Sequence, residues 1–219
     1  MMMSLLTSDN KTPSYVNTSF TATSLGPQIT FNYPTDSRAG DLIVAHITAE
    51  NRVLPNVPAG WSTVYANTIT NSEGPGSART LISTIRGTES NVTVNVSGGG
   101  SVICTALRNF QNKINPNTEF AIGNTSNGTT FNYTIANNRQ MFIVMLSNDG
   151  GNTPAPTLNI STSVGAPAAT GNLTWFYNNS YPYRAMSIAY ASDVATSNTA
   201  NVYISKDRAY GVYFYVTAT

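Results

Sequence analysis

The chain has 219 residues and a hydrophobic content of 41%, which suffices for a sizeable core and argues against a disordered chain. Charged residues make up only 10%, against about 25% in average soluble proteins. The net charge is +1 and no basic run occurs, so we expect no nucleic-acid partner. The polar positions hold mainly Ser, Thr, Asn and Gly, which predicts a surface that makes neutral hydrogen-bonded contacts.

Targeting and redox signals are weak. The first residues lack the basic region and apolar run of a signal peptide. No apolar run reaches the roughly 18 residues that a membrane-spanning helix needs, so we expect no membrane partner. The single cysteine, Cys104, cannot form an internal disulfide, and its apolar neighbours predict a small core residue rather than a nucleophile.

Residues 1–25 show no sustained period, and turn-forming residues occupy positions 8–13. We predict an extended N-terminal arm, which either frays or lies on a neighbouring subunit. Scattered apolar side chains are the candidate arm contacts: Leu5, Leu6, Tyr15, Val16 and Phe20.

Short β-branched and aromatic runs separated by turn residues then predict strands along the rest of the chain. In the first half we expect them at 28–33, 41–49, 61–66, 79–86, 92–96 and 102–110, with a loop at 71–76. A polar bridge covers 111–127. In the second half we expect strands at 129–135, 141–147, 157–162, 173–177, 184–191, 200–205 and 210–216.

No segment has the apolar spacing of an amphipathic helix. Residues 141–146 are apolar throughout, which predicts a strand buried on both faces. A dozen or so short strands joined by hairpins predict an all-β fold, an antiparallel β-sandwich of jelly-roll-like type, covering residues 26–219.

The sequence also repeats itself. The tetrapeptide Thr-Phe-Asn-Tyr at 30–33 recurs at 130–133, and Ile43-Val44 matches Ile143-Val144 at the same offset of 100. Residues 91–97 match 199–205 at an offset of 108. A growing offset indicates a duplicated unit with loop insertions. We therefore predict sequence-related halves, 26–112 and 125–219, that build one sandwich; two small sandwiches in tandem are the alternative.

No set of residues spells out a reaction, so we expect a protein that is not an enzyme. A hydrolase would have to use His46, the only histidine, which lies mid-strand and is better explained as a polar-face or interface residue. One His and one Cys do not make a usual zinc site. We expect no metal and no cofactor.

The carboxylates do not form a catalytic pair either. Asp41 and Glu50 bound one strand and lie about 30 Å apart, too far to cooperate. Asp41 is better explained as a side chain that binds turn backbone after Gly40. The glycines at 98–100 precede no helix, so they do not indicate a phosphate site.

Aromatic residues are the remaining signal. Tyr203, Tyr213 and Tyr215 alternate with apolar neighbours and should face away from the core, and further aromatics cluster at 175–183. Such residues form a subunit interface, a sugar-stacking platform, or a second core if both sheet faces are covered. The candidates are Trp175, Tyr177, Tyr181, Tyr183, Tyr203, Tyr213 and Tyr215.

A group of short motifs resembles a pattern of tailed-bacteriophage virion proteins, the structural proteins of head decoration and tail. The matching segments are Ala39-Gly40-Asp41-Leu42-Ile43-Val44-Ala45, Val57-Pro58-Ala59-Gly60-Trp61, Ala78-Arg79, Ser101-Val102 and Leu107-Arg108-Asn109-Phe110. The second half departs from this pattern, since Asn-Arg-Gln at 138–140 replaces the Gly-Asp step and no Pro-x-Gly-Trp follows. The resemblance implies a non-enzymatic β-sandwich.

We therefore expect a phage virion structural protein, more specifically a capsid decoration or cement accessory that assembles in the host cytoplasm. Its expected partners are other virion proteins, the major capsid or tail subunits, and further copies of itself. The alternative is a tail-fibre or baseplate module that binds host carbohydrate, with Trp175, Tyr177, Tyr181 and Tyr183 as stacking residues.

Overall fold

The computed structural model describes ten stretches of the chain. They are residues 13–23, 26–71, 74–115, 129–135, 140–148, 158–161, 174–178, 186–191, 195–204 and 209–219, with side chains at 13–23, 26–68, 76–111, 140–146 and 211–219. Every regular element in these stretches is a β-strand, and every strand pairing is antiparallel. The predicted antiparallel all-β fold is confirmed. In these stretches no helix could cross a membrane.

The described stretches contain fifteen strands. The first seven are β1 (Ser14–Thr23), β2 (Gln28–Asn32), β3 (Leu42–Ala49), β4 (Ser62–Asn71), β5 (Gly74–Thr84), β6 (Asn91–Asn95) and β7 (Gly100–Arg108). The next eight are β8 (Phe110–Asn115), β9 (Thr129–Ile135), β10 (Gln140–Asn148), β11 (Leu158–Ser161), β12 (Thr174–Asn178), β13 (Met186–Ala191), β14 (Ala195–Ile204) and β15 (Ala209–Ala218).

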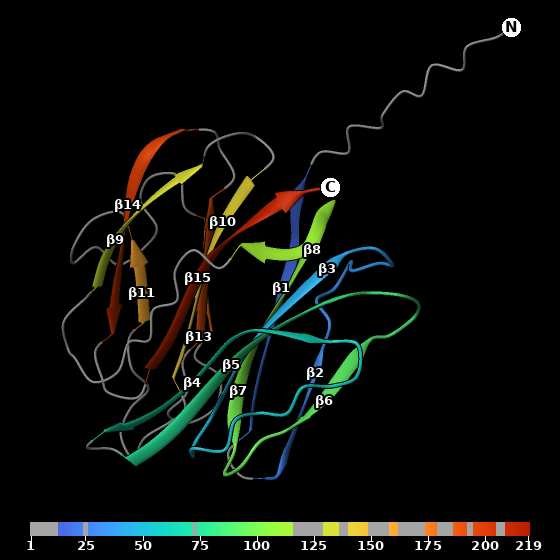
Figure 1. The fold of residues 1–219 in the computed structure, drawn as a ribbon, viewed down its shortest axis with the longest axis vertical. Coiled ribbons are helices and arrows are strands. Elements are labelled where there is room, and N and C mark those ends of the chain that lie inside the picture. The colour runs from blue at the N-terminus through green and yellow to red at the C-terminus, as the bar shows by residue number, and fades with distance from the viewer. Residues whose placement is uncertain are drawn as a thin grey trace, which may run out of the picture.

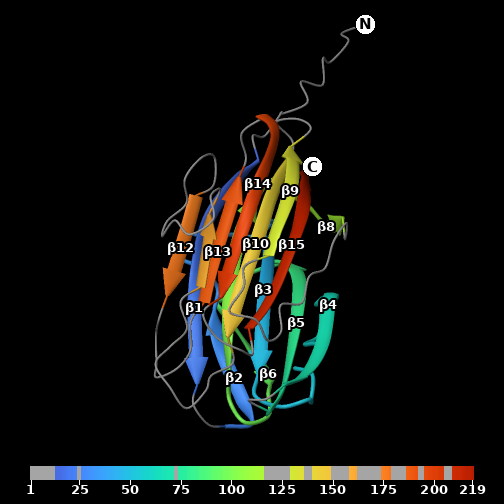
Figure 2. The ribbon, with the colours of Figure 1, turned by 90° about the vertical axis from the view of Figure 1, so that its left-hand side faces the viewer.

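The strands form four sheets stacked in layers (Figure 1). Two five-stranded sheets lie in the middle, with strand orders β1-β7-β3-β5-β4 and β8-β15-β10-β13-β12. The pair β2-β6 covers the outer face of the first, and the sheet β11-β14-β9 lies against the second. Figure 2, turned by 90°, shows the long strands of the middle sheets running along the molecule.

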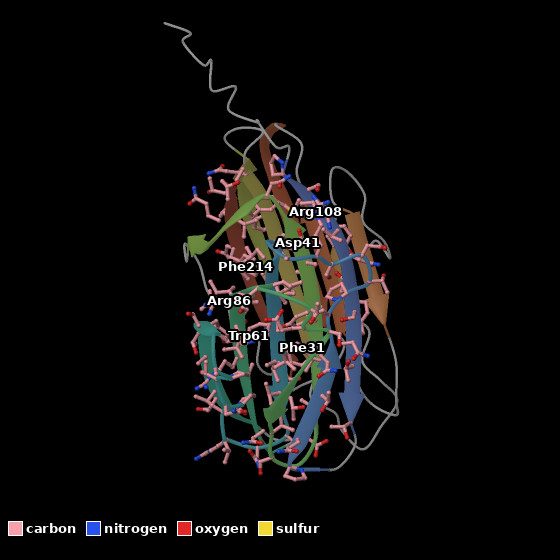
Figure 3. The ribbon with its side chains drawn as sticks, turned by 90° about the vertical axis from the view of Figure 1, so that its right-hand side faces the viewer. Phe31, Asp41, Trp61, Arg86, Arg108 and Phe214 are labelled. Carbon is pink, nitrogen blue, oxygen red and sulfur yellow. The ribbon has the colours of Figure 1, made fainter. Side chains whose placement is uncertain are left out.

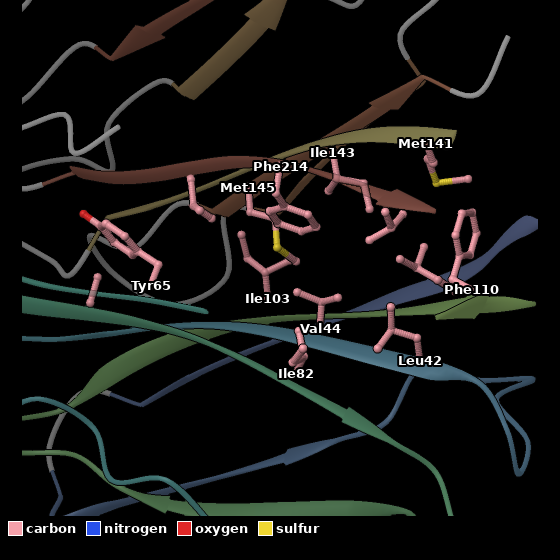
Figure 4. Packing of buried hydrophobic residues seen from close by; sticks show 14 residues of the cluster. Leu42, Val44, Tyr65, Ile82, Ile103, Phe110, Met141, Ile143, Met145 and Phe214 are labelled. Atoms are coloured by element: carbon pink, nitrogen blue, oxygen red, sulfur yellow. The ribbon is translucent and has the colours of Figure 1, made fainter. Parts of the chain in front are cut away.

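The two middle sheets share one apolar layer, the inter-sheet core, seen in Figure 4. Its buried residues are Leu42, Val44, Tyr65, Ala78, Ile82, Ile103, Leu107, Phe110, Met141, Ile143, Met145, Val212, Phe214 and Val216. The members come from both halves of the sequence, so neither middle sheet can bury its inner face without the other.

The second apolar layer, the outer core, lies between the first middle sheet and β2-β6. Its buried residues are Ile29, Phe31, Ile43, Ala45, Ile47, Ala49, Trp61, Leu81, Ile85, Val94, Val96, Val102, Cys104 and Ala106. Strand β3 therefore contributes alternate residues to two cores and is buried at every position. Residues 141–146 of β10 are also buried throughout, as predicted for a strand with both faces covered.

The predicted arm differs from the structure in its described part. Residues Ser14–Thr23 form β1, which pairs with β7 at the edge of the first middle sheet. A bulge at Val16 makes Tyr15 and Phe20 face the inter-sheet core while Val16 packs on the outer core. This bulge breaks the alternation of period 2, which is why the sequence pattern hides the strand. Residues 1–12, with Leu5 and Leu6, lie outside the described residues.

Two connections also differ from prediction. The loop expected at 71–76 is largely strand, because β4 runs to Asn71 and β5 begins at Gly74. The polar bridge expected at 111–127 begins with β8, which pairs with β15 in the second middle sheet. The first segment is rich in Gly and the second in Asn, and sheet pairing overrides this turn-like composition.

The order of strands repeats between the two halves. The two middle sheets have equivalent strand orders, in which the positions of β1, β7, β3, β5 and β4 are taken by β8, β15, β10, β13 and β12. The pair β2-β6 corresponds in the same way to β9-β14. The residue match predicted from sequence does not preserve the faces, however. Ile43 lies in the outer core, whereas Ile143 lies in the inter-sheet core. The sequence relationship of the halves therefore stays a prediction.

A buried ion pair ties the start of β3 to the end of β7 (Figure 3). Arg108 donates from Nε to Asp41 Oδ1 at 3.0 Å and from Nη2 to Oδ2 at 2.9 Å, and its Nη2 also reaches the Asp36 carbonyl at 2.9 Å. The Arg38 amide donates to Asp41 Oδ2 at 2.9 Å, so the predicted role of Asp41 in binding turn backbone is confirmed. Gly40, at φ +91°, allows the turn that presents Asp41.

We predict that the inter-sheet core makes the two halves unfold together. Replacing Phe214, which is 1% exposed, by Ala should cost about 3–5 kcal/mol and should lower hydrogen-exchange protection in β3 as well as in β15. Urea denaturation followed by hydrogen-exchange mass spectrometry measures both effects. Thr217→Ala on the same strand is the control and should change stability by less than about 0.5 kcal/mol. Unchanged protection in β3 would contradict the prediction.

We also predict that Asp41 and Arg108 act as a coupled pair. Arg108→Met leaves a carboxylate that is 2% exposed without its counter-ion and should cost about 3 kcal/mol. In the double variant Asp41→Asn/Arg108→Met the side chain at 41 still accepts the Arg38 amide but carries no charge. The double variant should therefore be more stable than Arg108→Met alone in urea denaturation, and additive losses would refute the coupling.

Candidate functional site

The outer face of the β2-β6 sheet carries a regular uncharged array. Alternate residues of both strands point inward and are apolar, as Ile29, Phe31 and Val94 show. The residues between them are exposed and polar, and they pair across the two strands. This outer ladder consists of Gln28, Thr30, Asn32, Asn91, Thr93 and Asn95.

Cross-strand hydrogen bonds hold the outer ladder in order. Gln28 Nε2 donates to Asn95 Oδ1 at 3.0 Å, and the Thr30 and Thr93 hydroxyl oxygens are 2.7 Å apart. Two-stranded sheets are weak by themselves, but the outer core fixes this one on the first middle sheet. The result is a preorganised surface of amides and hydroxyls without a charged group.

Similar residue types pair at the other end of the stack. In the β9-β14 pairing Thr130 lies opposite Asn201, and Asn132 lies opposite Thr199. The strand pairs at the two ends of the stack (Figure 1) thus use the same residue types in different pairings, Thr with Thr and Asn with Asn in β2-β6 but Thr with Asn in β9-β14.

A cleft of about 320 Å³ opens beside the outer ladder, between the end of β2, the turn before β4 and the segment that joins β5 to β6. Trp61 and Tyr33 form its aromatic wall, with ring centroids 6.3 Å apart and planes tilted by 51°. Gly60, at φ +82°, shapes the turn, and its carbonyl accepts the Ser83 hydroxyl at 3.0 Å. Arg86 lies near Trp61 on this side (Figure 3).

The polar side of the cleft is built by the turn after β5. The Gly87 amide donates to Glu89 Oε2 at 2.7 Å, and the Tyr33 amide donates to the Ser90 carbonyl at 2.8 Å. Hydrogen bonds from the backbone amides of Glu89 itself and of Gly87 hold the pKa of the Glu89 carboxyl below its usual range. Glu89 is therefore ionised at neutral pH, beside the exposed Arg86.

Tyr33 stays protonated over the whole physiological range. Burial, with smaller contributions from Cys104 and Glu89, raises the pKa of Tyr33 to about 12. Its hydroxyl therefore remains a hydrogen-bond donor at neutral and moderately alkaline pH.

The sequence predicted that His46 lies on a polar face or at an interface. In the structure His46 is fully buried on the inter-sheet side of β3. Its Nδ1 is 2.9 Å from the Thr80 hydroxyl. The buried hydroxyls of Thr48 and Ser101, 2.6 Å apart, lie further along the same face. A histidine that solvent cannot reach is a structural residue of the sheet stack.

Cys104 is a buried member of the outer core, as predicted. Burial raises the pKa of its thiol, so the reactive thiolate is suppressed. Among the described residues, no group of three or more His, Cys, Asp or Glu side chains could hold a metal ion.

The predicted aromatic residues are only partly described. Tyr213 and Tyr215 lie opposite the inter-sheet core side chains of β15, as their alternation predicted, and they are half-buried against Phe142, with ring centroids 5.9 and 5.2 Å away. Their face is the one on which the β11-β14-β9 sheet packs, which favours the covered-face interpretation. The side chains of Trp175, Tyr177 and Tyr203 lie outside the described ones, as do Tyr181 and Tyr183 entirely.

The candidate arm contacts serve the chain's own fold where they are described. Tyr15 and Phe20 pack against the inter-sheet core and Val16 against the outer core. Sequence analysis did not single out Tyr33, Arg86 or Glu89 as site residues. The Val57–Trp61 motif was the sequence feature that could have indicated the cleft, because its residues build one wall of the cleft.

Comparison with family models, with curated proteins and with solved structures gave no match to this chain.

We predict an alkaline signature of Tyr33. An unfolded tyrosine has a pKa of about 10, so between pH 10 and 12 the unfolded state loses the proton that the folded state keeps. The contribution of Tyr33 to stability is therefore complete below pH 10 and is lost as the pH rises to 12. Tyr33→Phe should remove this loss, which urea midpoints measured across this pH range will show. Parallel curves for both proteins would contradict it.

Proposed function

We propose that this protein is a structural component of a phage virion, a decoration or cement accessory that binds neighbouring subunits through uncharged surface. The outer ladder carries the proposal. It is a regular array of exposed amide and hydroxyl side chains on a two-stranded sheet that a buried core holds in place.

The ladder suits protein–protein contact because its geometry is fixed before binding. Ordered side chains lose little conformational freedom when a partner docks, which favours association. Amides and hydroxyls each donate and accept, so they can satisfy a partner's polar groups without burying a charge. An interface of this kind is polar and specific, as subunit contacts that close only on assembly need to be.

The resemblance to tailed-bacteriophage virion proteins supports the assignment to a particle. The structure gives its motifs physical roles. The Gly-Asp step and Arg108 form the buried ion pair, and the Val57–Trp61 segment anchors Trp61 in the outer core. These roles are architectural, which agrees with a protein whose purpose is contact.

The test is recovery of the chain with particles. An epitope-tagged chain produced during phage growth should band with intact particles in a density gradient at a fixed number of copies per particle. We predict that Thr30→Lys, which places a charge in the outer ladder, lowers the particle-bound fraction at least tenfold, because the ammonium would be desolvated without a partner.

Thr63→Lys is the matched control, since Thr63 is an exposed threonine on a strand outside the ladder. It should bind as the wild type does. A wild-type chain found only in the free fraction would overturn the virion role. Equal binding of Thr30→Lys and the wild type would overturn the role of the ladder.

A further inference from the structure

We propose that the cleft beside Trp61 is a binding site for a neutral saccharide, with the half-buried Tyr33 ring and the 9% of Trp61 that stays exposed facing the sugar ring, and the Arg86–Glu89 side binding its hydroxyls. Nothing in the structural role proposed above requires this site, and it uses residues outside the outer ladder except Asn91.

The size of the cleft fits a small ligand. Its volume of about 320 Å³ lies at the lower end of the range of about 300–1,000 Å³ that is usual for ligand pockets. Its walls combine aromatic, apolar and polar groups, because Pro58 and Ala59 adjoin Trp61 on one side and Thr84 and Asn91 lie on the polar side. A sugar ring has the same division, with an apolar C–H face and a rim of hydroxyls.

The polar groups of the cleft can satisfy sugar hydroxyls, which both donate and accept. Arg86 donates, Glu89 accepts, and the Tyr33 hydroxyl remains a donor. Among the described side chains, none forms a hydrogen bond or ion pair with the Arg86 guanidinium or the Asn91 amide group, and both groups are exposed. These groups are therefore open to a ligand in a place whose shape other bonds already fix.

Other ligand classes fit the cleft less well. A phosphate or a polyanion would meet the ionised Glu89 carboxylate as well as Arg86, so its charge would be opposed as much as attracted. A purely apolar ligand would leave the guanidinium and the carboxylate desolvated without partners. A neutral polar ligand with a flat apolar side can contact both the aromatic wall and the polar side of the cleft.

The cleft is preorganised. The Trp61 amide donates to the Pro58 carbonyl at 3.2 Å, and the Ser83 hydroxyl holds the Gly60 carbonyl, so the Trp61 wall is fixed from both sides. The Gly87–Glu89 bond fixes the opposite wall. Small-molecule sites are usually formed before the ligand arrives, and here little ordering is left to binding.

The experiment is a glycan array probed with the full chain, followed by calorimetric titration of the neutral oligosaccharides that bind. We expect micromolar to millimolar binding to neutral glycans and at least a tenfold loss for Arg86→Ala and for Glu89→Gln, because each removes a charge-assisted hydrogen bond. Arg38→Ala is the matched control: Arg38 is exposed on the same half, and its hydrogen bonds to Asp41 come from its backbone amide and carbonyl, which the substitution keeps.

Tryptophan fluorescence supplies a second readout. The chain has two tryptophans, Trp61 and Trp175, so a Trp175→Phe variant reports on the cleft alone. Its emission should shift when the neutral glycan is added. An empty array would overturn the proposal, as would preference for acidic glycans or binding that Arg86→Ala leaves unchanged. Loss of binding by Thr30→Lys with Arg86→Ala unaffected would place the glycan on the outer ladder instead.

Discussion

The fold depends on one constraint, the burial of its central strands on both faces. Strand β3 gives alternate residues to the inter-sheet core and to the outer core, and residues 141–146 of β10 are likewise buried. A stack of four layers has two middle sheets with no solvated face, so it offers few places where a charge can be hydrated. The low content of charged residues follows from this architecture. The ion pair of Asp41 and Arg108 sits where a middle sheet ends, and there the arginine keeps 24% of its side-chain surface exposed.

The sequence predicted the class of fold and most strands because alternating and wholly apolar runs have few other interpretations. It did not predict β1, since the bulge at Val16 moves apolar residues from one face to the other. It also did not predict which face each repeated residue takes. Ile43 and Ile143 match in sequence but enter different cores, because a strand that is apolar on both faces has no alternation to fix its register.

The candidate site was less accessible to sequence reasoning for a physical reason. Tyr33, Trp61 and Arg86 lie in three separate segments, and only the packing of β2, β4 and β5 brings them around one cleft. Isolated aromatic and charged residues in turns resemble ordinary surface residues until that packing is known. The conspicuous tyrosines of β15, by contrast, are half-buried against Phe142 and contribute to packing. The tyrosines of β15 stood out in the sequence because they alternate regularly with apolar residues. The cleft residues do not stand out, because contacts between segments far apart in the sequence bring them together.

The outer ladder has a consequence for the environments in which its contacts can persist. At an ionic strength of about 0.1 M, ions largely screen the attraction between exposed charges that lie more than about 10 Å apart, but they have little to act on where both partners present amides and hydroxyls. The cross-strand bonds of Gln28 with Asn95 and of Thr30 with Thr93 involve no titrating group. The subunit contact that we propose for the outer ladder should therefore persist from dilute fresh water to brine and across a wide range of acidity.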